Sequence, residues 1–384
     1  INLADDGVNS EKRSISVPAC LTAGVLVCSL LLGILQWVGA PAHGGMQTRQ
    51  SGEKLASFVE QRLSDARRGL NGLERIYWID PHALSAPTPN PANYSRINSP
   101  EHLAAVEEAA QPLLDGQTLF FSGDITLLPG TAVRCYLDKT ILAITWKQAI
   151  DGGVYTFSEI KIAHPSQFRR FLAGGEFGSE KLFVTTEMAQ SVNAVVASSG
   201  DFYNYRQAGT LVYDGLVRRV NNGLVDTCYV DKNGDLVFSS REDDRSREEF
   251  QQFVEEENIL FSLAFGPVLI RQGQVVTPER YAVGEIHDHY PRSALCQLGK
   301  LHYLLAVVNS EGDYQQTPTL RRFGEVLQDR GVQTAYTLDG GQTAVIAMDG
   351  ELINAVLFGY QRKISDIIYF ATAIPAGQNE ETDI

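Results

Sequence analysis

The residues with the clearest capacity for chemistry lie where an apolar run leads into a single carboxylate. Asp339 follows the run 335–338, and Gly340 and Gly341 come directly after it. A strand that ends here would present the carboxylate at its tip, and glycine, which lacks a Cβ, would let a substrate approach the backbone closely. Asp-Gly is also a common hairpin turn. The run therefore predicts either a catalytic carboxylate or a turn.

Three further residues could complete a site around such a carboxylate. Arg292 could bind two phosphate oxygens at once through its guanidinium, which lysine cannot do, or it could form a surface ion pair. Asp201 could be a second carboxylate or could cap a turn. Tyr203 could stack on a sugar ring or only pack against the protein.

The reaction that this chain's resemblance to known proteins implies, the cleavage of a sugar–phosphate diester at the anomeric carbon, would use residues of these types. A carboxylate near that carbon can attack it or stabilise the oxocarbenium-like transition state. A cation must hold the phosphate while charge moves onto it. A phosphodiester leaves as a weakly basic anion, so strong acid assistance is less necessary than for an ordinary glycoside. A cationic clamp is therefore the natural partner of one carboxylate.

Five short segments, in the expected order, resemble the phosphodiester glycosidase family. The resemblance begins near Glu159 and runs to Ile367. The segments are 195–203, 264–269, 290–295, 338–341 and 362–366. The resemblance implies a hydrolase that acts on phosphodiester-linked sugars.

The residues and the resemblance together give a candidate site. We expect Asp339, Arg292 and Asp201 to be catalytic. The expected substrate-binding residues are Ser199, Gly200, Tyr203, Gly266, Gly340, Gly341 and Thr343. We expect no cofactor.

Two departures from the family pattern keep a second interpretation open. Ser199 stands where the family usually has Asn, and Asn309-Ser310 stands where many members have Asp-Gly. These changes leave room for altered specificity or lost activity. The alternative is a catalytically weak carbohydrate-binding or scaffold protein on the same fold, and a third alternative is a phosphodiesterase that cuts the P–O bond instead of the C–O bond.

A dense polar group just before Arg292 raises the question of a metal. Glu285, His287, Asp288 and His289 include ligand types that suit zinc. No further ligands follow at matching spacing. We therefore interpret the group as a polar loop and expect no metal.

The composition limits the classes of partner. The chain has 384 residues and a net charge of −14 at pH 7. No window is strongly basic, so binding to DNA or RNA has little electrostatic support. Outside the N-terminal apolar segment, Cys135, Cys228 and Cys296 remain; three cysteines do not make a disulfide framework, and we expect them to be small buried apolar residues. The oligomeric state stays open.

The N-terminal part carries a second clear signal. Between Arg13 and Arg49 there is no Lys, Arg, Asp or Glu. The segment 14–40 is long enough to cross a bilayer as a helix, and the basic residues before it favour a cytoplasmic tail over 1–13. The alternative is a cleaved signal peptide, whose apolar core is typically shorter. We therefore expect a single-pass membrane anchor and an extracytoplasmic C-terminal domain.

The rest of the sequence predicts an α+β protein with a mixed, mainly antiparallel sheet and interleaved helices. Residues 41–117 are expected to form a juxtamembrane helical and Pro-rich linker region, and 118–384 the catalytic domain. Helices are predicted over 51–73, 101–114, 165–173, 246–257 and 319–329.

The charge pattern around 14–40 predicts the topology of the chain. Because basic residues stay on the cytoplasmic side, the domain that follows should lie outside the cytoplasm. A reporter that is active only outside the cytoplasm should be active when fused after Ile384 and inactive when fused after Ser10. Protease added to intact cells should also digest the C-terminal domain. If the domain is protected from this protease, it lies in the cytoplasm and the predicted topology is wrong.

Overall fold

Long runs of β-branched and aromatic residues make strands the main elements of the structure. The computed structural model describes residues 77–121, 125–221, 224–282, 285–309 and 314–375. The predicted membrane span 14–40 and the predicted helix 51–73 lie outside these residues. Among the residues described, no helix is both long and apolar enough to cross a membrane.

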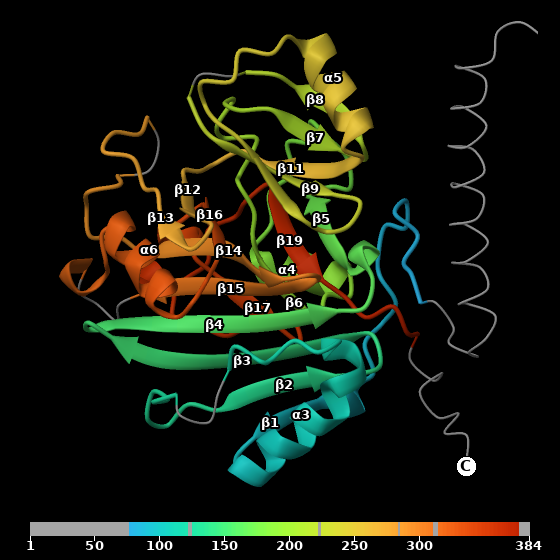
Figure 1. Cartoon of the computed structure of the whole chain (residues 1–384), viewed down its shortest axis with the longest axis vertical. Helices are drawn as coiled ribbons and strands as arrows, with labels where there is room; N and C mark the ends of the chain where they lie inside the picture. The colour runs from blue at the N-terminus through green and yellow to red at the C-terminus, as the bar shows by residue number, and fades with distance from the viewer. Residues whose placement is uncertain (1–76, 122–124, 222–223, 283–284, 310–313, 376–384) are drawn as a thin grey trace, which may run out of the picture. The chain divides into compact units, whose positions relative to one another are not determined.

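A nine-stranded antiparallel sheet forms the centre of the fold (Figure 1). Its long strands β3, β4, β15 and β14 follow one another in space, and their side chains alternate between two covered faces. In spatial order the strands are β1 (Tyr94–Ile97), β2 (Val133–Leu137), β3 (Ile141–Ile150), β4 (Gly153–Ile162), β15 (His302–Asn309), β14 (Arg292–Gly299), β16 (Thr334–Leu338), β12 (Val268–Arg271) and β13 (Gln274–Val275).

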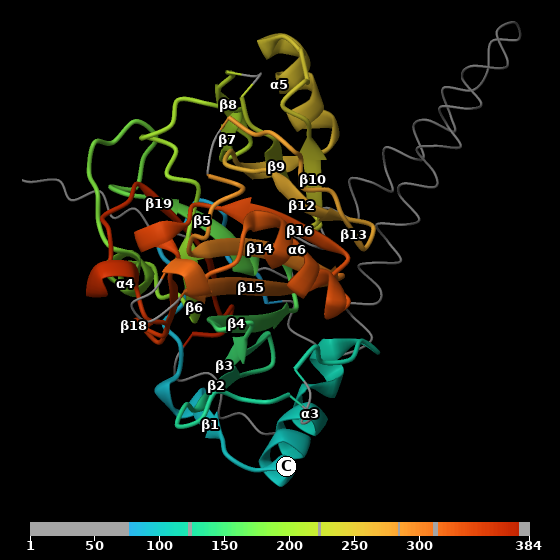
Figure 2. The same ribbon diagram turned by 90° about the vertical axis from the view of Figure 1, so that its left-hand side faces the viewer.

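Two five-stranded antiparallel sheets lie beside the large sheet (Figure 2). One contains β10 (Leu236–Ser239), β9 (Thr227–Asp231), β11 (Ile259–Leu263), β7 (Leu211–Tyr213) and β8 (Leu216–Arg219). The other contains β18 (Glu351–Leu352), β17 (Ile346–Met348), β6 (Val196–Ser199), β19 (Asp366–Phe370) and β5 (Phe168–Leu172).

Hydroxyl caps fix the starts of three helices. Ser99, Ser246 and Thr319 each accept a backbone N–H of the first helical turn. Three of the predicted helices are thereby confirmed, whereas α4 was not predicted. The helices are α3 (Pro100–Leu114), α4 (Thr185–Ser191), α5 (Arg247–Glu256) and α6 (Leu320–Asp329). Short 3-10 turns are η1 (Pro91–Asn93), η2 (Pro165–Gln167), η3 (Tyr314–Gln316), η4 (Gly341–Thr343) and η5 (Leu357–Gly359).

The core is divided between the faces of the sheets. Helices α3 and α6 pack on one face of the nine-stranded sheet, and the two smaller sheets pack on the other. The Phe168 ring lies where the three sheets meet, with its centroid 4.5 Å from Phe370, 5.0 Å from Tyr303 and 5.3 Å from Phe261. Helices α4 and α5 cover the outer faces of the two smaller sheets.

The α+β class with antiparallel sheets is confirmed, but the helix predicted over 165–173 is wrong. Only Pro165–Gln167 forms a helical turn, and Phe168–Leu172 is strand β5, paired with β19. Phe168, Arg170 and Leu172 all point into the core. An arginine at a core position interrupts the apolar alternation, so the pattern resembled a helix.

The compact unit that holds the sheets begins at Tyr77 and not at residue 118, where the sequence placed the domain boundary. Strand β1 pairs with β2 along its whole length. Helix α3 buries Leu103 and Val106 against the large sheet. Residues 77–117 are therefore part of the domain, because they supply its edge strand and one of its covering helices.

A buried ion network joins β5 to the ends of β6 and β19. Arg170 Nη2 lies 2.5 Å from Asp201 Oδ1 and 2.8 Å from Asp366 Oδ2, and all three side chains are fully buried. Burial raises the pKa of the Asp366 carboxyl, Arg170 opposes that rise, and Asp201 adds to it. One guanidinium therefore holds two carboxylates inside the protein.

This network predicts a large loss of stability when its cation is removed. Arg170→Leu should lower the free energy of unfolding by about 3–5 kcal/mol, because it leaves buried carboxylates without a counter-charge. Urea unfolding followed by circular dichroism measures the loss. Arg134→Leu is the control, since Arg134 pairs with the exposed Glu351 and should cost less than about 1 kcal/mol. Similar losses for both variants would contradict the structural role of Arg170.

Candidate active site

Two turns from different sheets meet at the candidate site. The turn after β6 carries Ser199 and Gly200, and the turn after β16 carries Asp339 and Thr343. The Asp339 N–H donates to the Gly200 carbonyl over 3.4 Å, and the Ser199 hydroxyl donates to the Thr343 carbonyl. The structure therefore brings these predicted site residues together from distant parts of the chain.

Asp339 supplies the carboxylate at this meeting point. The residue is only 9% exposed, and burial raises the pKa of its carboxyl to about 6. The charges of Arg206 and Arg362 and a hydrogen bond from Thr343 oppose that rise, whereas Asp201 adds to it. Asp339 is therefore ionised at neutral pH, largely shielded from water, and acted on by two cations.

The two arginines are each supported by aromatic rings. The Arg206 guanidinium lies over the Phe265 ring at 4.3 Å, and its Nη1 is buried without a hydrogen-bond partner among the described residues. The Arg362 guanidinium lies 4.9 Å from the centre of the Phe202 ring and 5.2 Å from that of Tyr205. Aromatic faces attract a guanidinium and hold it in place, so both cations are positioned for an anionic ligand.

The contacts of Arg292 differ from those expected of a phosphate-binding residue. Its Nη2 donates to the backbone carbonyls of Glu285 at 2.7 Å and Asp288 at 2.6 Å. Burial lowers the pKa of the guanidinium to about 10, against the opposing charges of Glu285, Asp288 and Tyr290. Arg292 therefore ties down the loop before β14, and its fork is partly occupied by that loop.

Asp201 and Tyr203 are committed to the protein interior. Asp201 Oδ2 accepts the Ala264 N–H at 2.6 Å, and its Oδ1 faces Arg170. Tyr203 is 1% exposed, and its ring lies 5.6 Å from Phe177 and 5.7 Å from the Arg170 guanidinium. The packing alternative therefore describes Tyr203, and Asp201 supports the turn after β6.

The glycines of the predicted site make room for the protein's own atoms. A Cβ on Gly200 would lie 1.9 Å from Asp366 Oδ2. Gly341 has a φ of +67°, which disfavours other residues, and a Cβ there would lie 2.9 Å from the Tyr290 ring. The other predicted glycines enclosed in this way are Gly266 and Gly340. These contacts show close packing of the turns at the glycines, and the expectation that a substrate approaches the backbone there stays a prediction.

The polar group before β14 forms hydrogen bonds to loop backbone. His287 Nε2 lies 2.8 Å from the Glu279 carbonyl, and His289 Nδ1 lies 2.5 Å from that of Thr317. Within the part of the chain that the structure describes, no group of three or more His, Cys, Asp or Glu is arranged to hold a metal ion.

Ser199 and Asn309, the two residues that depart from the family pattern, both lie in hydrogen-bond networks that reach the backbone around η4. The Ser199 hydroxyl donates a hydrogen bond to the Thr343 carbonyl. Asn309 Oδ1 accepts a hydrogen bond from Asn354 Nδ2 at 2.9 Å, and the same Nδ2 donates to the Ala344 carbonyl at 2.8 Å. These polar side chains hold the turn that follows Asp339.

Sequence analysis does not identify the residues that supply the cations. Arg362 lies in one of the family segments, but the sequence gives it no role. Arg206 lies in no recognised motif. A weak signal exists, because Arg206 directly follows the aromatic-rich run 202–205, a composition that favours cation–π contacts. Tyr205 is 67% exposed, so its ring is open to a ligand.

Residues 192–371 match the family model of the phosphodiester glycosidases. The resemblance predicted from the sequence is thereby confirmed. The chain is also similar to the zebrafish N-acetylglucosamine-1-phosphodiester alpha-N-acetylglucosaminidase catalytic domain auto-inhibited by its pro-peptide. The identity is 17%, the match covers 61% of this chain and 84% of that chain, and the TM-score is 0.51. At this identity the likeness shows the fold alone.

Two further solved structures are more distant. A hypothetical protein from Synechocystis is 15% identical, over 63% of this chain and 64% of that chain, with a TM-score of 0.44. A putative exported protein from Burkholderia pseudomallei is 12% identical, over 57% and 74% respectively, with a TM-score of 0.36. No curated protein matches the chain in sequence.

The geometry predicts which arginine controls the titration of Asp339. In carbon-detected NMR its carboxyl should titrate near pH 6, since burial raises its pKa. Arg206→Gln removes a charge that lowers this pKa, so the midpoint should rise by roughly one unit. Arg292→Gln should leave the midpoint in place. A shift in the Arg292 variant with none in the Arg206 variant would contradict the assignment.

Proposed function

We propose that this chain, whose residues 192–371 belong to the phosphodiester glycosidase family, hydrolyses a glycosyl-1-phosphodiester at the C–O bond of the sugar. One observation carries the proposal: the desolvated Asp339 carboxylate lies in the field of Arg206 and Arg362. A sugar phosphodiester needs this combination, with a carboxylate at its anomeric carbon and a cation at its phosphate.

Asp339 would act at the anomeric carbon. Above pH about 6 it is ionised, and its charge can attack the carbon or stabilise the positive charge that develops on the sugar ring. Shielding from water strengthens that attraction, because the Coulomb energy rises as the local dielectric falls. Protonation below the pKa would remove both abilities.

Arg206 and Arg362 would hold the phosphate. When the C–O bond breaks, its electron pair stays on the phosphate oxygen, so negative charge grows on the leaving group. Guanidinium groups already in place stabilise that charge without reorganising. The buried Nη1 of Arg206, which has no partner within the described ranges, is a donor available for this purpose.

Tyr205 would provide a surface for the sugar in place of the buried Tyr203. Its ring is stacked on Phe202 with centroids 5.4 Å apart, and 67% of the residue is exposed. The C–H face of a sugar ring packs favourably on the electron-rich face of an aromatic ring. The ring stands beside Arg362, the cation assigned to the phosphate.

A second candidate function is a carbohydrate-binding or scaffold protein without turnover. The observation in its favour is that the Ser199 hydroxyl donates to the Thr343 carbonyl and Asn309 Oδ1 accepts from the Asn354 side chain, at positions where the family usually has other residues. The two functions differ in turnover and not in binding, so one kinetic experiment separates them.

The proposed substrate lies in the cell envelope or in exopolysaccharide material. This location rests on the apolar segment 14–40, which is expected to anchor the chain with its domain outside the cytoplasm. The net charge of −14 gives no general attraction to anionic polymers, so binding would depend on the local arginines.

Turnover of a sugar-1-phosphodiester by the full chain tests the proposal. Asp339→Asn should lower kcat by about 10³-fold or more, because it removes the charge at the reacting carbon at nearly constant size. For the unaltered chain, kcat/KM should fall as the pH drops through about 6, because protonation neutralises Asp339. In isotope-labelled water the label should enter the sugar.

The control is Asp329→Asn, whose side chain on α6 is 67% exposed and which should keep full activity. Label in the phosphate would show P–O cleavage. Binding of the diester without turnover would favour the scaffold function, and a fully active Asp339→Asn variant would refute the catalytic role of that residue.

A further inference from the structure

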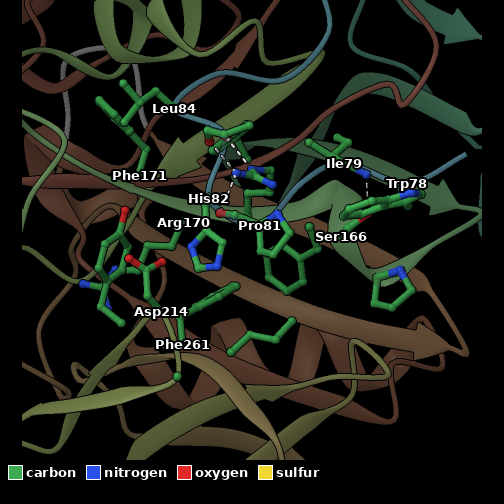
Figure 3. Close-up of a pocket in the computed structure, with 18 of the residues that line it drawn as sticks. Trp78, Ile79, Pro81, His82, Leu84, Ser166, Arg170, Phe171, Asp214 and Phe261 are labelled. Atoms are coloured by element: carbon green, nitrogen blue, oxygen red, sulfur yellow. Dashed lines mark hydrogen bonds between the residues drawn. The ribbon is translucent and has the colours of Figure 1, made fainter. Parts of the chain in front are cut away.

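A cavity of about 570 Å³ lies apart from the candidate active site (Figure 3). Its volume falls in the range of about 300–1,000 Å³ that is usual for small-molecule sites. Asp339, Arg206 and Arg362 do not line it. The cavity is therefore separate from the chemistry proposed above.

One wall of the cavity is the segment 77–86, which we call the strap. The Ile79 N–H donates to Ser166 Oγ at 2.9 Å. Arg169 donates to three strap carbonyls at distances from 2.7 to 3.2 Å. These bonds fasten the strap to β5 and η2, so it forms a fixed wall.

The inside of the cavity is largely apolar. The strap contributes Trp78 and Leu84, which are 58% and 76% exposed. Figure 3 shows strap side chains around the cavity together with Phe171 and Phe261. The aromatic lining residues are Trp78, Phe168, Phe171, Tyr213, Phe261 and Tyr369. Large apolar side chains left exposed at a concave surface indicate that an apolar ligand body would be stabilised there.

The charged groups around the cavity are mostly positive, although the chain carries a net charge of −14. Lys232 is exposed at the cavity, the exposed His82 can donate a ring N–H, and Asp214 is the acidic residue in its lining. Arg169 adds a further positive charge. Burial lowers the pKa of His164, which keeps that imidazole neutral. A local excess of positive charge attracts an anion and repels a cation.

We propose that this cavity binds a small amphipathic anion. An unbranched chain or ring would occupy the space between the strap and β11, and one carboxylate or phosphate-type head would lie near Lys232 and His82. The aromatic walls explain why the body of the ligand would be apolar. The positive residues at the rim explain why its head group would be negatively charged. A neutral or cationic amphiphile would match only the walls.

Three probes with the same alkyl chain and different charge test this proposal: decanoate, decanol and decyltrimethylammonium. They are titrated into the full chain by calorimetry, below the concentrations at which they form micelles. Decanoate should bind most tightly, decanol about 5-fold more weakly, and the cation more weakly still, as expected for one exposed charge interaction. Equal affinity for all three would overturn the anionic preference.

Trp78 gives an independent readout at the mouth of the cavity. Its emission should shift to the blue when decanoate binds, because the ring loses contact with water, whereas Trp146 is already fully buried. Trp78→Phe should remove the shift while calorimetry still detects binding. A shift that survives in Trp78→Phe would place the ligand elsewhere.

Substitutions at two lining residues test where the apolar body and the charged head of the ligand bind. Leu84→Ser should weaken decanoate and decanol alike, by about 5-fold, because it removes part of the apolar wall. Lys232→Glu should weaken decanoate by a similar factor and leave decanol unchanged. Leu352→Ser on β18 and Arg321→Glu on α6, both of which are exposed and do not line the cavity, should change nothing. Absence of any decanoate binding would overturn the site.

Discussion

The fully buried guanidinium of Arg170 is the interaction on which the candidate active site depends. It lies 2.5 Å from Asp201 and 2.8 Å from Asp366, and without it two carboxylates would be buried side by side without a counter-charge, at a cost of about 3–5 kcal/mol. Asp366 also accepts the backbone N–H groups of Asp201 and Phe202. The network therefore fixes the turn after β6, and that turn receives the N–H of Asp339.

The same turn holds an aromatic residue in an unfavourable backbone conformation. Phe202 has a φ of +54°, a left-handed value that costs a bulky residue about 1–3 kcal/mol. The hydrogen bond from its N–H to Asp366 Oδ1, at 2.9 Å, helps to keep it there. This conformation leads the chain on to Tyr205, which stacks on Phe202, and to Arg206, whose charge acts on the buried Asp339 carboxylate. The turn after β6 thus accepts a strained residue because the fold needs an unusual direction of the chain there.

A protein with a net charge of −14 must collect positive charge locally if it is to bind an anion. At the candidate active site the fold does so by resting Arg206 on Phe265 and Arg362 on Phe202. Each ring contributes a favourable cation–π contact and limits the motion of the guanidinium. Local order therefore replaces the general electrostatic attraction that a basic surface would provide.

The α+β class, three capped helices and the carboxylate after β16 could be predicted from the sequence, because apolar periodicity, capping residues and the Asp339 run are local features of the chain. Five short segments also indicated the resemblance to the phosphodiester glycosidases, whose family model matches residues 192–371. The three-dimensional structure alone identified the arginines whose charges act on Asp339, since Arg206 and Arg292 look alike in sequence and the direction of a long side chain depends on carbonyls and rings from other strands. It likewise turned Asp201 from a candidate catalyst into a structural partner of Arg170, because burial and a counter-charge arise only when separate strands come together.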